Sequence, residues 1–199
     1  VRRLLPALLV IVSASSIASY FYLLPIQFEE FIKSVVSSIF FFSNFFFHFS
    51  GQAYGAQVLS EIPLLHTWSL SVEEQFYVLY PIFLIGLLTF IKKRISLIII
   101  IGILSSLLFA TIINLNHQSF NFYMLPSRIW ELLFGALLGV NINEFSIGKN
   151  KKIKEILAIV GFSIILLSFS FFQNTGDHPS YLTLIPIIGA YLIIQDVDK

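Results

Sequence analysis

The run ISLIIIIGILSSLLFATIIN, residues 95–114, has no charged side chain at any of its positions. The hydrocarbon core of a bilayer is about 30 Å thick, so an α-helix needs about 20 apolar residues to cross it. Inside that core every backbone polar group must be hydrogen-bonded within the protein, and a helix satisfies this requirement by itself. This run therefore predicts a transmembrane helix and indicates the class of the whole fold.

The composition of the chain agrees with this prediction. Of the 199 residues, 57% are hydrophobic and 12% are charged, whereas ordinary soluble domains are about 25% charged. The net charge of +1 lacks the basic excess typical of nucleic-acid binding, and the absence of Cys excludes thiolate chemistry. We therefore predict an all-α, polytopic transmembrane helix bundle that is surrounded by membrane lipid and has no nucleic-acid partner.

Five further stretches have the composition of membrane spans. The six predicted spans are Leu4–Leu24, Leu70–Ile91, Ile95–Asn114, Arg128–Asn143, Ile156–Phe172 and Tyr181–Gln195. A seventh apolar stretch, Phe31–Phe49, is ambiguous by hydropathy alone. We predict a single membrane-embedded domain over residues 1–199, and we expect the natural chain to continue beyond both ends.

Basic residues indicate the orientation of the spans, because cytoplasmic loops have an excess of Lys and Arg. If Phe31–Phe49 does not cross, all basic clusters fall on one side; these are Arg2–Arg3, Lys92–Arg94, Lys149–Lys154 and Lys199. If it crosses, Arg2–Arg3 lies opposite the others. We therefore predict that Phe31–Phe49 is re-entrant or packed on the outer face, and that residues 25–69 form one long outer segment.

Two adjacent carboxylates occur at the start of the second predicted span, in the stretch LHTWSLSVEEQFY, residues 65–77. Ionisable groups within membrane segments cost about 2.5–3.5 kcal/mol to insert, and they indicate a functional site by default. Glu73 and Glu74 are the candidates. A structural interpretation is also open for Glu74, because Ser71 followed three residues later by Glu fits a capping box, and Glu in a first helical turn suits the macrodipole.

His66 and Trp68 precede these carboxylates at the predicted membrane edge. Each residue alone is typical of a membrane interface, where Trp in particular is enriched. Their crowding with two carboxylates at one helix start favours a site that contacts substrate. The remaining histidines lack metal-ligand spacing, so no metal site is predicted; they are His48, His117 and His178.

A second polar stretch, YMLPSRIWEL at residues 123–132, begins another predicted span. Arg128 and Glu131 share a helical face, which by itself predicts a weak local ion pair. A cation near a helix N-terminus is disfavoured by the macrodipole, so we expect a further anionic group near Arg128. In the predicted layout both polar stretches begin spans at the outer side, and we therefore predict that Arg128 pairs with Glu73 or Glu74.

Two other patterns have mainly structural interpretations. Gly135 and Gly139 form a GxxxG motif, which predicts close approach of another helix. Arg2–Arg3 at the inner end of the first span suits positive-inside anchoring. The alternative for this pair is the binding of a cytoplasmic phosphate group.

Residues 65–77 resemble the signature of the acyltransferase family 3 membrane proteins, as does LPSRIWELLFG at residues 125–135. The opening stretch, Arg2–Leu8, is similar to that family's basic-to-proline junction, and Ser43–Phe45 and Leu184–Pro186 also match its pattern. The resemblance covers nearly the whole chain. It implies a multi-pass protein of the bacterial inner membrane that transfers an acyl group other than an amino-acyl group. The donor would be acyl-CoA, commonly cytoplasmic acetyl-CoA, and the acceptor a hydroxyl of lipopolysaccharide, another envelope polysaccharide or a glycolipid.

The resemblance also implies roles for individual residues. Supporting catalytic roles fall to Glu73, Glu74, Arg128 and Glu131, and substrate-binding roles to Arg3, His66 and Trp68. Arg3 would bind CoA phosphates, and no bound cofactor is implied. The family's proposed catalytic His follows an Arg after ten residues, and none of the four His here does so. We therefore expect that His upstream of Val1, expect residues 1–199 alone to be inactive, and allow for an outer SGNH-hydrolase-like domain beyond the C-terminus.

Two other functions stay open on these residues. Intramembrane charges also suit a secondary transporter, although the sequence lacks paired broken helices in two matching halves. A non-catalytic membrane scaffold or relay subunit is the third possibility. Consumption of acyl-CoA distinguishes the acyltransferase from both.

Overall fold

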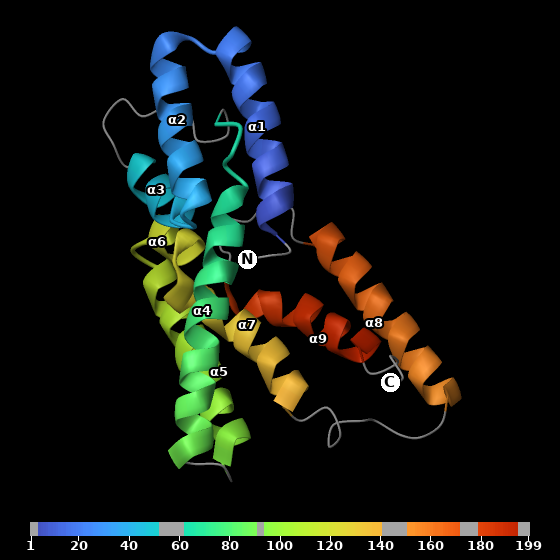
Figure 1. Ribbon diagram of the computed structural model, residues 1–199. Helices are drawn as coiled ribbons and strands as arrows, with labels where there is room; N and C mark the ends of the chain where they lie inside the picture. Colours follow the sequence, from blue (N-terminus) through green and yellow to red (C-terminus); the bar gives the residue numbers. More distant parts are fainter. Residues whose placement is uncertain (1–3, 52–61, 91–93, 141–150, 172–178, 195–199) are drawn as a thin grey trace. The chain divides into compact units, whose positions relative to one another are not determined.

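The computed structural model describes residues 4–51, 62–90, 94–140, 151–171 and 179–194. Every regular element in these ranges is a helix (Figure 1), which confirms the predicted all-α class. The elements are α1 (Leu5–Tyr22), α2 (Pro25–Ile39), α3 (Ser43–Ser50), α4 (Thr67–Phe90), α5 (Ile95–Asn114), α6 (Gln118–Tyr123), α7 (Leu125–Val140), α8 (Lys151–Phe171), the 3-10 helix η3 (Tyr181–Thr183) and α9 (Leu184–Ile194).

Four of these helices, α1, α4, α5 and α8, are long and apolar enough to cross a membrane. They correspond to four of the six predicted spans, and α5 has the predicted bounds. The other two spans correspond to shorter helices, α7 with 16 residues and α9 with 11. Their predicted ends, at residues 141–143 and 195, lie outside the described residues, so six crossings remain a prediction.

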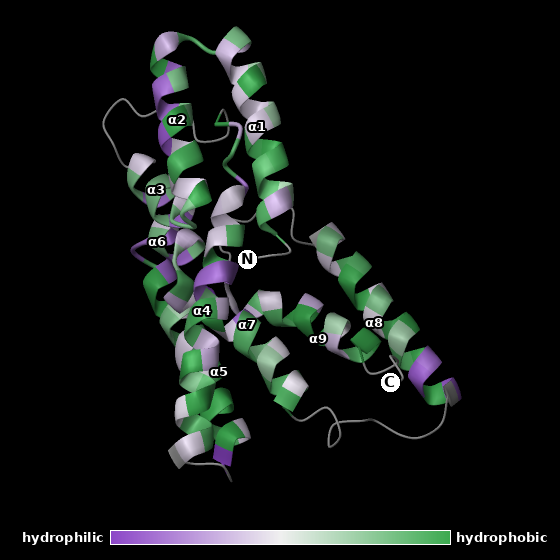
Figure 2. Cartoon of the chain, viewed as in Figure 1, coloured by the Kyte–Doolittle hydropathy of each residue, from purple (hydrophilic) through white to green (hydrophobic). Residues whose placement is uncertain are grey.

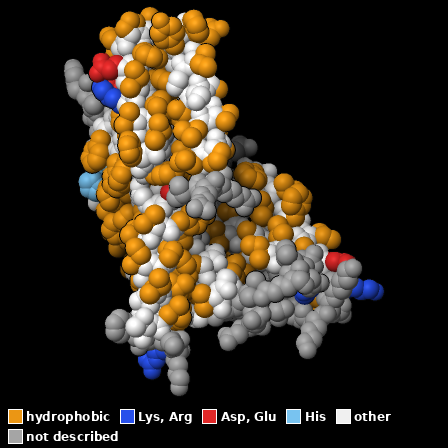
Figure 3. Space-filling view, viewed as in Figure 1, with side chains coloured by type: hydrophobic (Ala, Val, Ile, Leu, Met, Phe, Trp, Pro, Cys, Tyr) orange, Lys and Arg blue, Asp and Glu red, His pale blue; other side chains and the backbone are white. Residues whose placement is uncertain are grey.

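The long helices expose apolar side chains, as a lipid-facing surface requires. Ile101 and Ile112 of α5 are more than half exposed, and so are Ile159 and Phe169 of α8. Figure 2 shows hydrophilic residues only in short stretches of the ribbons. Figure 3 shows hydrophobic side chains over most of the face in view. Large exposed apolar patches on a protein indicate a membrane or a partner as their surroundings.

The ambiguous stretch Phe31–Phe49 is not one continuous helix. It is divided between α2 and α3, and the break includes Phe41, whose φ of 57° lies in the left-handed region. With 15 and 8 residues, neither helix has the length of a span. This agrees with the prediction that the stretch does not cross as a single helix. Its placement as re-entrant or outer-face stays a prediction.

The described chain falls into two compact units, which we describe separately. The first unit comprises residues 1–86 and 123–125, and the second comprises residues 87–122 and 126–199. In the first unit, α1 and α2 run antiparallel, joined by a short link (Figure 1). Their core joins Leu8 and Val12 of α1 to Phe31 of α2 and to Leu64, which precedes α4.

This core corrects one part of the predicted layout. The prediction placed the start of the first span on the inner face and residues 25–69 on the outer face, about 30 Å away. The structure instead packs Leu64 against Leu8, so the starts of α1 and α4 lie together. The prediction that the segment before α4 lies at the opposite face of the membrane from the start of α1 is therefore wrong. The physical reason is that α2 runs back along α1, which a count of basic residues does not reveal.

Helix packing in the second unit is closest where α8 meets α9. A Cβ atom on Gly161 would lie 2.5 Å from the carbonyl oxygen of Gly189. By contrast, a Cβ atom on Gly135 or Gly139 would meet no described atom within 4 Å. The close approach predicted at the GxxxG motif is therefore wrong for the described part of the chain, because spacing shows only that approach is possible and not where a partner helix packs.

Candidate active site

Helix α4 begins at an earlier residue of the first polar stretch than the predicted span, which started at Leu70. α4 begins at Thr67, and the Thr67 amide and hydroxyl donate to the Leu64 carbonyl at 3.0 and 2.8 Å. Glu73 and Glu74 therefore lie in the second helical turn, beyond the free N–H groups of the first turn. The Ser71 hydroxyl donates to the Thr67 carbonyl at 3.3 Å, inside the helix. The capping-box interpretation of Ser71 and Glu74 is therefore wrong.

Four hydroxyl groups connect α2, α3 and α4. The Ser38 and Thr67 hydroxyls lie 2.7 Å apart, and the Thr67 hydroxyl lies 3.1 Å from the Ser43 hydroxyl, to which it can give its single proton in place of the Leu64 carbonyl. The Ser43 hydroxyl in turn lies 2.7 Å from that of Ser71. Because each hydroxyl can donate and accept, the set forms a continuous hydrogen-bonded chain. We call it the hydroxyl chain, and no sequence pattern predicted it.

Two amide side chains hold the neighbouring turn of α4. Gln75 Nε2 donates to Asn44 Oδ1 and to the Phe41 carbonyl, both at 2.9 Å. Asn44 Nδ2 donates to the Tyr123 carbonyl at 3.3 Å, and the Asn44 side chain is fully buried. Buried polar groups need such partners. The sequence signals for this pair were the similarities of Ser43–Phe45 and of residues 65–77 to the family pattern, and neither indicated that the two amides meet.

The two predicted carboxylates of α4 differ in burial. Glu74 is only 3% exposed, whereas Glu73 is partly exposed. Burying a carboxylate is costly unless other groups stabilise it. Glu74 is therefore not a solvated surface charge, and its burial agrees with a functional or structural role inside the fold.

Trp68 and His66 occupy different environments. The Trp68 ring packs edge-to-face on the Tyr123 ring, with centroids 5.4 Å apart. Trp68 is thus part of the first unit's packing rather than only a residue of the membrane interface. His66 is exposed. The structure therefore brings Trp68, and not His66, together with the amide pair around Tyr123.

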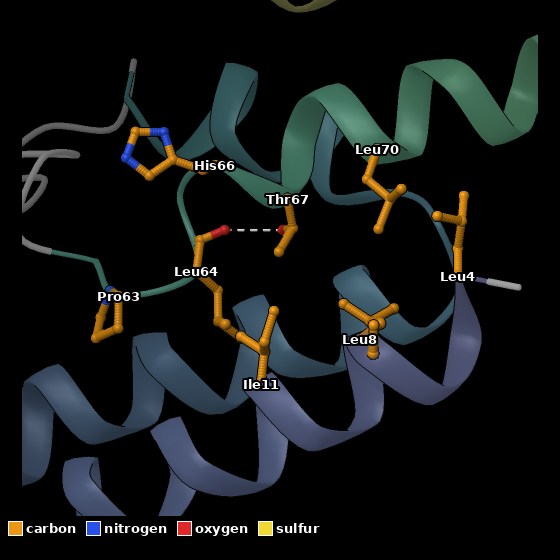
Figure 4. Close-up of a pocket in the computed structure, with 9 residues that line it drawn as sticks. Leu4, Leu8, Ile11, Pro63, Leu64, His66, Thr67 and Leu70 are labelled. Atoms are coloured by element: carbon orange, nitrogen blue, oxygen red, sulfur yellow. Dashed lines mark hydrogen bonds between the residues drawn. The ribbon is translucent and has the colours of Figure 1, made fainter.

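A pocket of about 370 Å³ lies between the start of α1 and the segment that leads into α4 (Figure 4). Its walls are mostly apolar, and Thr67 adds a hydroxyl that donates to the Leu64 carbonyl. Figure 4 shows the His66 imidazole turned away from Leu8 and Ile11, so it lies at the rim. The volume lies within the range of about 300–1,000 Å³ that is typical of small-molecule sites.

Three of the described interactions hold Arg128 within the second unit. Its Nη1 lies 3.5 Å from Glu131 Oε2, which is the predicted i, i+3 ion pair. Its Nε donates to the Phe122 carbonyl at 2.8 Å, and its guanidinium lies 5.1 Å from the Phe122 ring centroid. The carbonyl and the ring were not predicted. Pairing of Arg128 with Glu73 or Glu74 would join the two units and stays a prediction.

Two buried polar atoms next to Arg128 have no hydrogen-bond partner among the described residues. They are Trp130 Nε1, on a fully buried side chain, and Glu131 Oε1. An unsatisfied buried donor or acceptor costs about 1–3 kcal/mol. These two atoms are therefore an unsatisfied donor and an unsatisfied acceptor in the described part of the chain.

Two predictions concern the remaining candidates. Arg3 lies outside the described residues, so its predicted contact with CoA phosphates stays a prediction. Within the described ranges, no three His, Asp or Glu side chains gather to form a metal site.

Residues 1–195 match the model of a family described as an acyltransferase domain. The chain is 30% identical to a Haemophilus influenzae protein of unstated function, over all of this chain and 84% of that protein. It is 30% identical to the peptidoglycan O-acetyltransferase OatA of Listeria monocytogenes, over 96% of this chain and 32% of OatA. It is 31% identical to a provisionally named O-acetyltransferase of Staphylococcus aureus, over 98% of this chain and 34% of that protein. The chain thus spans about a third of the length of these two named relatives, and no solved structure matches it.

Proposed function

Because this chain belongs to acyltransferase family 3, whose model matches residues 1–195, we propose that it is the membrane part of an O-acyltransferase. The reaction moves an acyl group, most simply acetyl, from acyl-CoA to a hydroxyl of a cell-envelope glycan. The supporting names are those of the relatives, one of which is a peptidoglycan O-acetyltransferase. The proposed location is the bacterial inner membrane, with acyl-CoA supplied from the cytoplasm.

One observation carries the proposal for this chain's own residues: the burial of Glu74. An apolar helix long enough to cross a membrane has a carboxylate that is only 3% exposed. The capping role that would explain it structurally is excluded by the start of α4 at Thr67. Intramembrane carboxylates are expensive and functional by default. We therefore assign Glu74, with Glu73 beside it, to the working part of the protein.

The chemistry explains why charged groups are useful here. In the direct route, to which an acyl-enzyme intermediate is the alternative, the acceptor oxygen forms a bond to the carbonyl carbon of the thioester and the carbon–sulfur bond breaks. The acceptor hydroxyl gives its proton to a base, and the thiolate of CoA is released. A positioned base and groups that stabilise the developing oxyanion accelerate such a step. Glu74 is suited to orient the acceptor hydroxyl or its base, and we propose that this base is the His that the family resemblance implies.

Arg128 and Glu131 are suited to the charged or hydroxyl groups of the substrates. Arg128 is a cation fixed by the Phe122 carbonyl and by Glu131. Such a fixed guanidinium binds anionic oxygen well. Glu131 Oε1 is a free acceptor among the described residues, so it can receive a hydrogen bond from a sugar hydroxyl. His66 and Trp68 remain proposed parts of the acceptor entrance.

The test is mass spectrometry of the envelope polysaccharide from four bacterial strains. Three strains express the full-length gene in its native form, with Glu74→Gln or with Glu29→Gln, and the fourth lacks the gene. Glu29→Gln is the matched control, since the Glu29 side chain is 72% exposed. We expect the acyl mass to be present with the native protein and the control, and absent in the deletion and in Glu74→Gln.

Other outcomes have defined meanings. Loss of the acyl mass in the deletion alone would support the acyltransferase and show that its activity does not need Glu74. An unchanged glycan in the deletion would contradict the proposed acceptor. Membranes that also consume no acyl-CoA would contradict the acyltransferase and favour the transporter or relay subunit.

A further inference from the structure

The segment just before α7 is tied to α4 by two kinds of contact. Asn44 Nδ2 donates to the Tyr123 carbonyl at 3.3 Å, and Asn44 Oδ1 accepts from Gln75 Nε2 at 2.9 Å. The Tyr123 ring packs against Trp68 of α4. Backbone and side chain of Tyr123 are therefore both held by the first unit.

We call these contacts among Asn44, Gln75 and Tyr123 the tether, and Asn44 is its centre. Its side chain is fully buried, and it donates at one end while it accepts at the other. Gln75 is fixed at a second point, because it also donates to the Phe41 carbonyl at 2.9 Å. A buried amide whose partner is removed leaves a polar atom unsatisfied. The tether is therefore sensitive to single substitutions.

The tether bears on Arg128 through the covalent chain. The Phe122 carbonyl, which accepts from Arg128 Nε at 2.8 Å, belongs to the same planar peptide unit as the nitrogen and Cα of Tyr123. Fixing Tyr123 therefore restricts the direction in which the Phe122 carbonyl points. That carbonyl and the Phe122 ring, 5.1 Å from the guanidinium, are the described contacts that orient Arg128 together with Glu131.

We propose that Asn44 and Gln75 are positioning residues for Arg128, acting through Tyr123 and the Phe122 carbonyl. They need not touch substrate. The proposal rests on the proposed function for its activity measurement, but the tether itself is testable without activity.

The structural measurement is the ¹⁹F resonance of 5-fluorotryptophan at position 68 in the full-length protein, assigned by its loss in Trp68→Phe. Asn44→Asp keeps an acceptor for Gln75 but places an oxygen against the Tyr123 carbonyl. Gln75→Met keeps volume and removes the donor. We expect both variants to shift the Trp68 resonance. Ser37→Ala is the control, because the Ser37 hydroxyl donates to Ser34 of its own helix, and we expect no shift.

The activity measurement is kcat/KM for acyl transfer. We expect Asn44→Asp to lower it by about 10- to 100-fold, as for a misplaced charged group. In an Arg128→Lys background, Asn44→Asp should lower kcat/KM little further, because both substitutions disturb the same positioning of the charged group. A merely structural role would give additive losses.

Each result has a distinct consequence. An unchanged Trp68 resonance in both variants would overturn the tether. A shifted resonance with additive kinetic losses would overturn the link to Arg128. Absence of acyl transfer in the native full-length protein would contradict the proposed function, whereas the resonance shift would still decide the tether.

Discussion

The backbones of Gly161 in α8 and Gly189 in α9 are in direct contact. A Cβ atom on Gly161 would lie 2.5 Å from the Gly189 carbonyl oxygen, and one on Gly189 would lie 2.8 Å from the Gly161 carbonyl oxygen. In lipid, helices associate through van der Waals packing, which small residues permit at short range. This crossing therefore contributes to holding the short helix α9 against α8.

We predict that Gly161→Ala destabilises the protein by about 1–3 kcal/mol, as overpacking typically does. The added methyl group would force the two backbones apart. The measurement is the thermal unfolding midpoint of the full-length protein in detergent. Gly139→Ala is the matched control, because its methyl group would meet no described atom within 4 Å. Equal midpoints for the two variants would contradict the close crossing.

The hydroxyl chain predicts energetic coupling between Ser43 and Ser71. Their hydroxyls lie 2.7 Å apart, and the Ser43 amide also donates to the Ser71 hydroxyl at 3.2 Å. Ser71→Ala leaves buried groups of Ser43 unsatisfied, so we expect it to lower the free energy of unfolding by about 1–3 kcal/mol.

A double-mutant cycle measures this coupling. We expect Ser43→Ala combined with Ser71→Ala to cost less than the sum of the single substitutions, by about 0.5–1.5 kcal/mol. Ser43→Ala combined with Ser163→Ala should be additive, because the Ser163 hydroxyl bonds only within α8 in the described contacts. Additivity in both cycles would show that the hydroxyl chain does not link α3 to α4.

Long apolar helices were predictable because their signal is local. The bounds of α5 follow from an uninterrupted apolar run, and the polar start of α4 was recognised from its carboxylates. The Arg128–Glu131 pair was also predictable, because the spacing of two residues on one helix determines it. These features depend only on residues close together in sequence.

The remaining features depend on which segments meet in space. Ser43 and Ser71 have no pattern that indicates their contact, and Gly161 and Gly189 are isolated glycines on different helices. The capping motif at Ser71 was misleading because the turn before Thr67 starts the helix one turn earlier. Tertiary pairing decided the two contacts between helices, whereas a local turn that no sequence pattern indicated decided the start of α4.

Burial raises the pKa of Tyr123 above its ordinary value of 10.0, because the surroundings disfavour the phenolate. Its neutral form therefore contributes stability that is intact below about pH 10 and is lost as the pH rises through the folded-state pKa. We expect the phenolate absorbance of Tyr123, obtained by subtracting the spectrum of Tyr123→Phe, to appear above pH 10. In denaturant, the pKa of Tyr123 obtained in the same way should return toward 10.0. A native titration at or below 10.0 would contradict the burial of Tyr123.

Replacement of Arg128 by lysine tests whether its geometry or its charge matters. Arg128→Lys keeps the positive charge but loses the Nε donor, which lies 2.8 Å from the Phe122 carbonyl. Hydrogen bonds to charged groups contribute about 1.5–3 kcal/mol. We therefore expect kcat/KM for transfer from radiolabelled acyl-CoA, in membranes with the full-length protein, to fall by about 10- to 100-fold. Arg94→Lys, at an exposed position, is the matched control and should keep native activity. If Arg128→Lys does the same, a positive charge alone is sufficient at this position, and the Phe122 carbonyl has no role in orienting it.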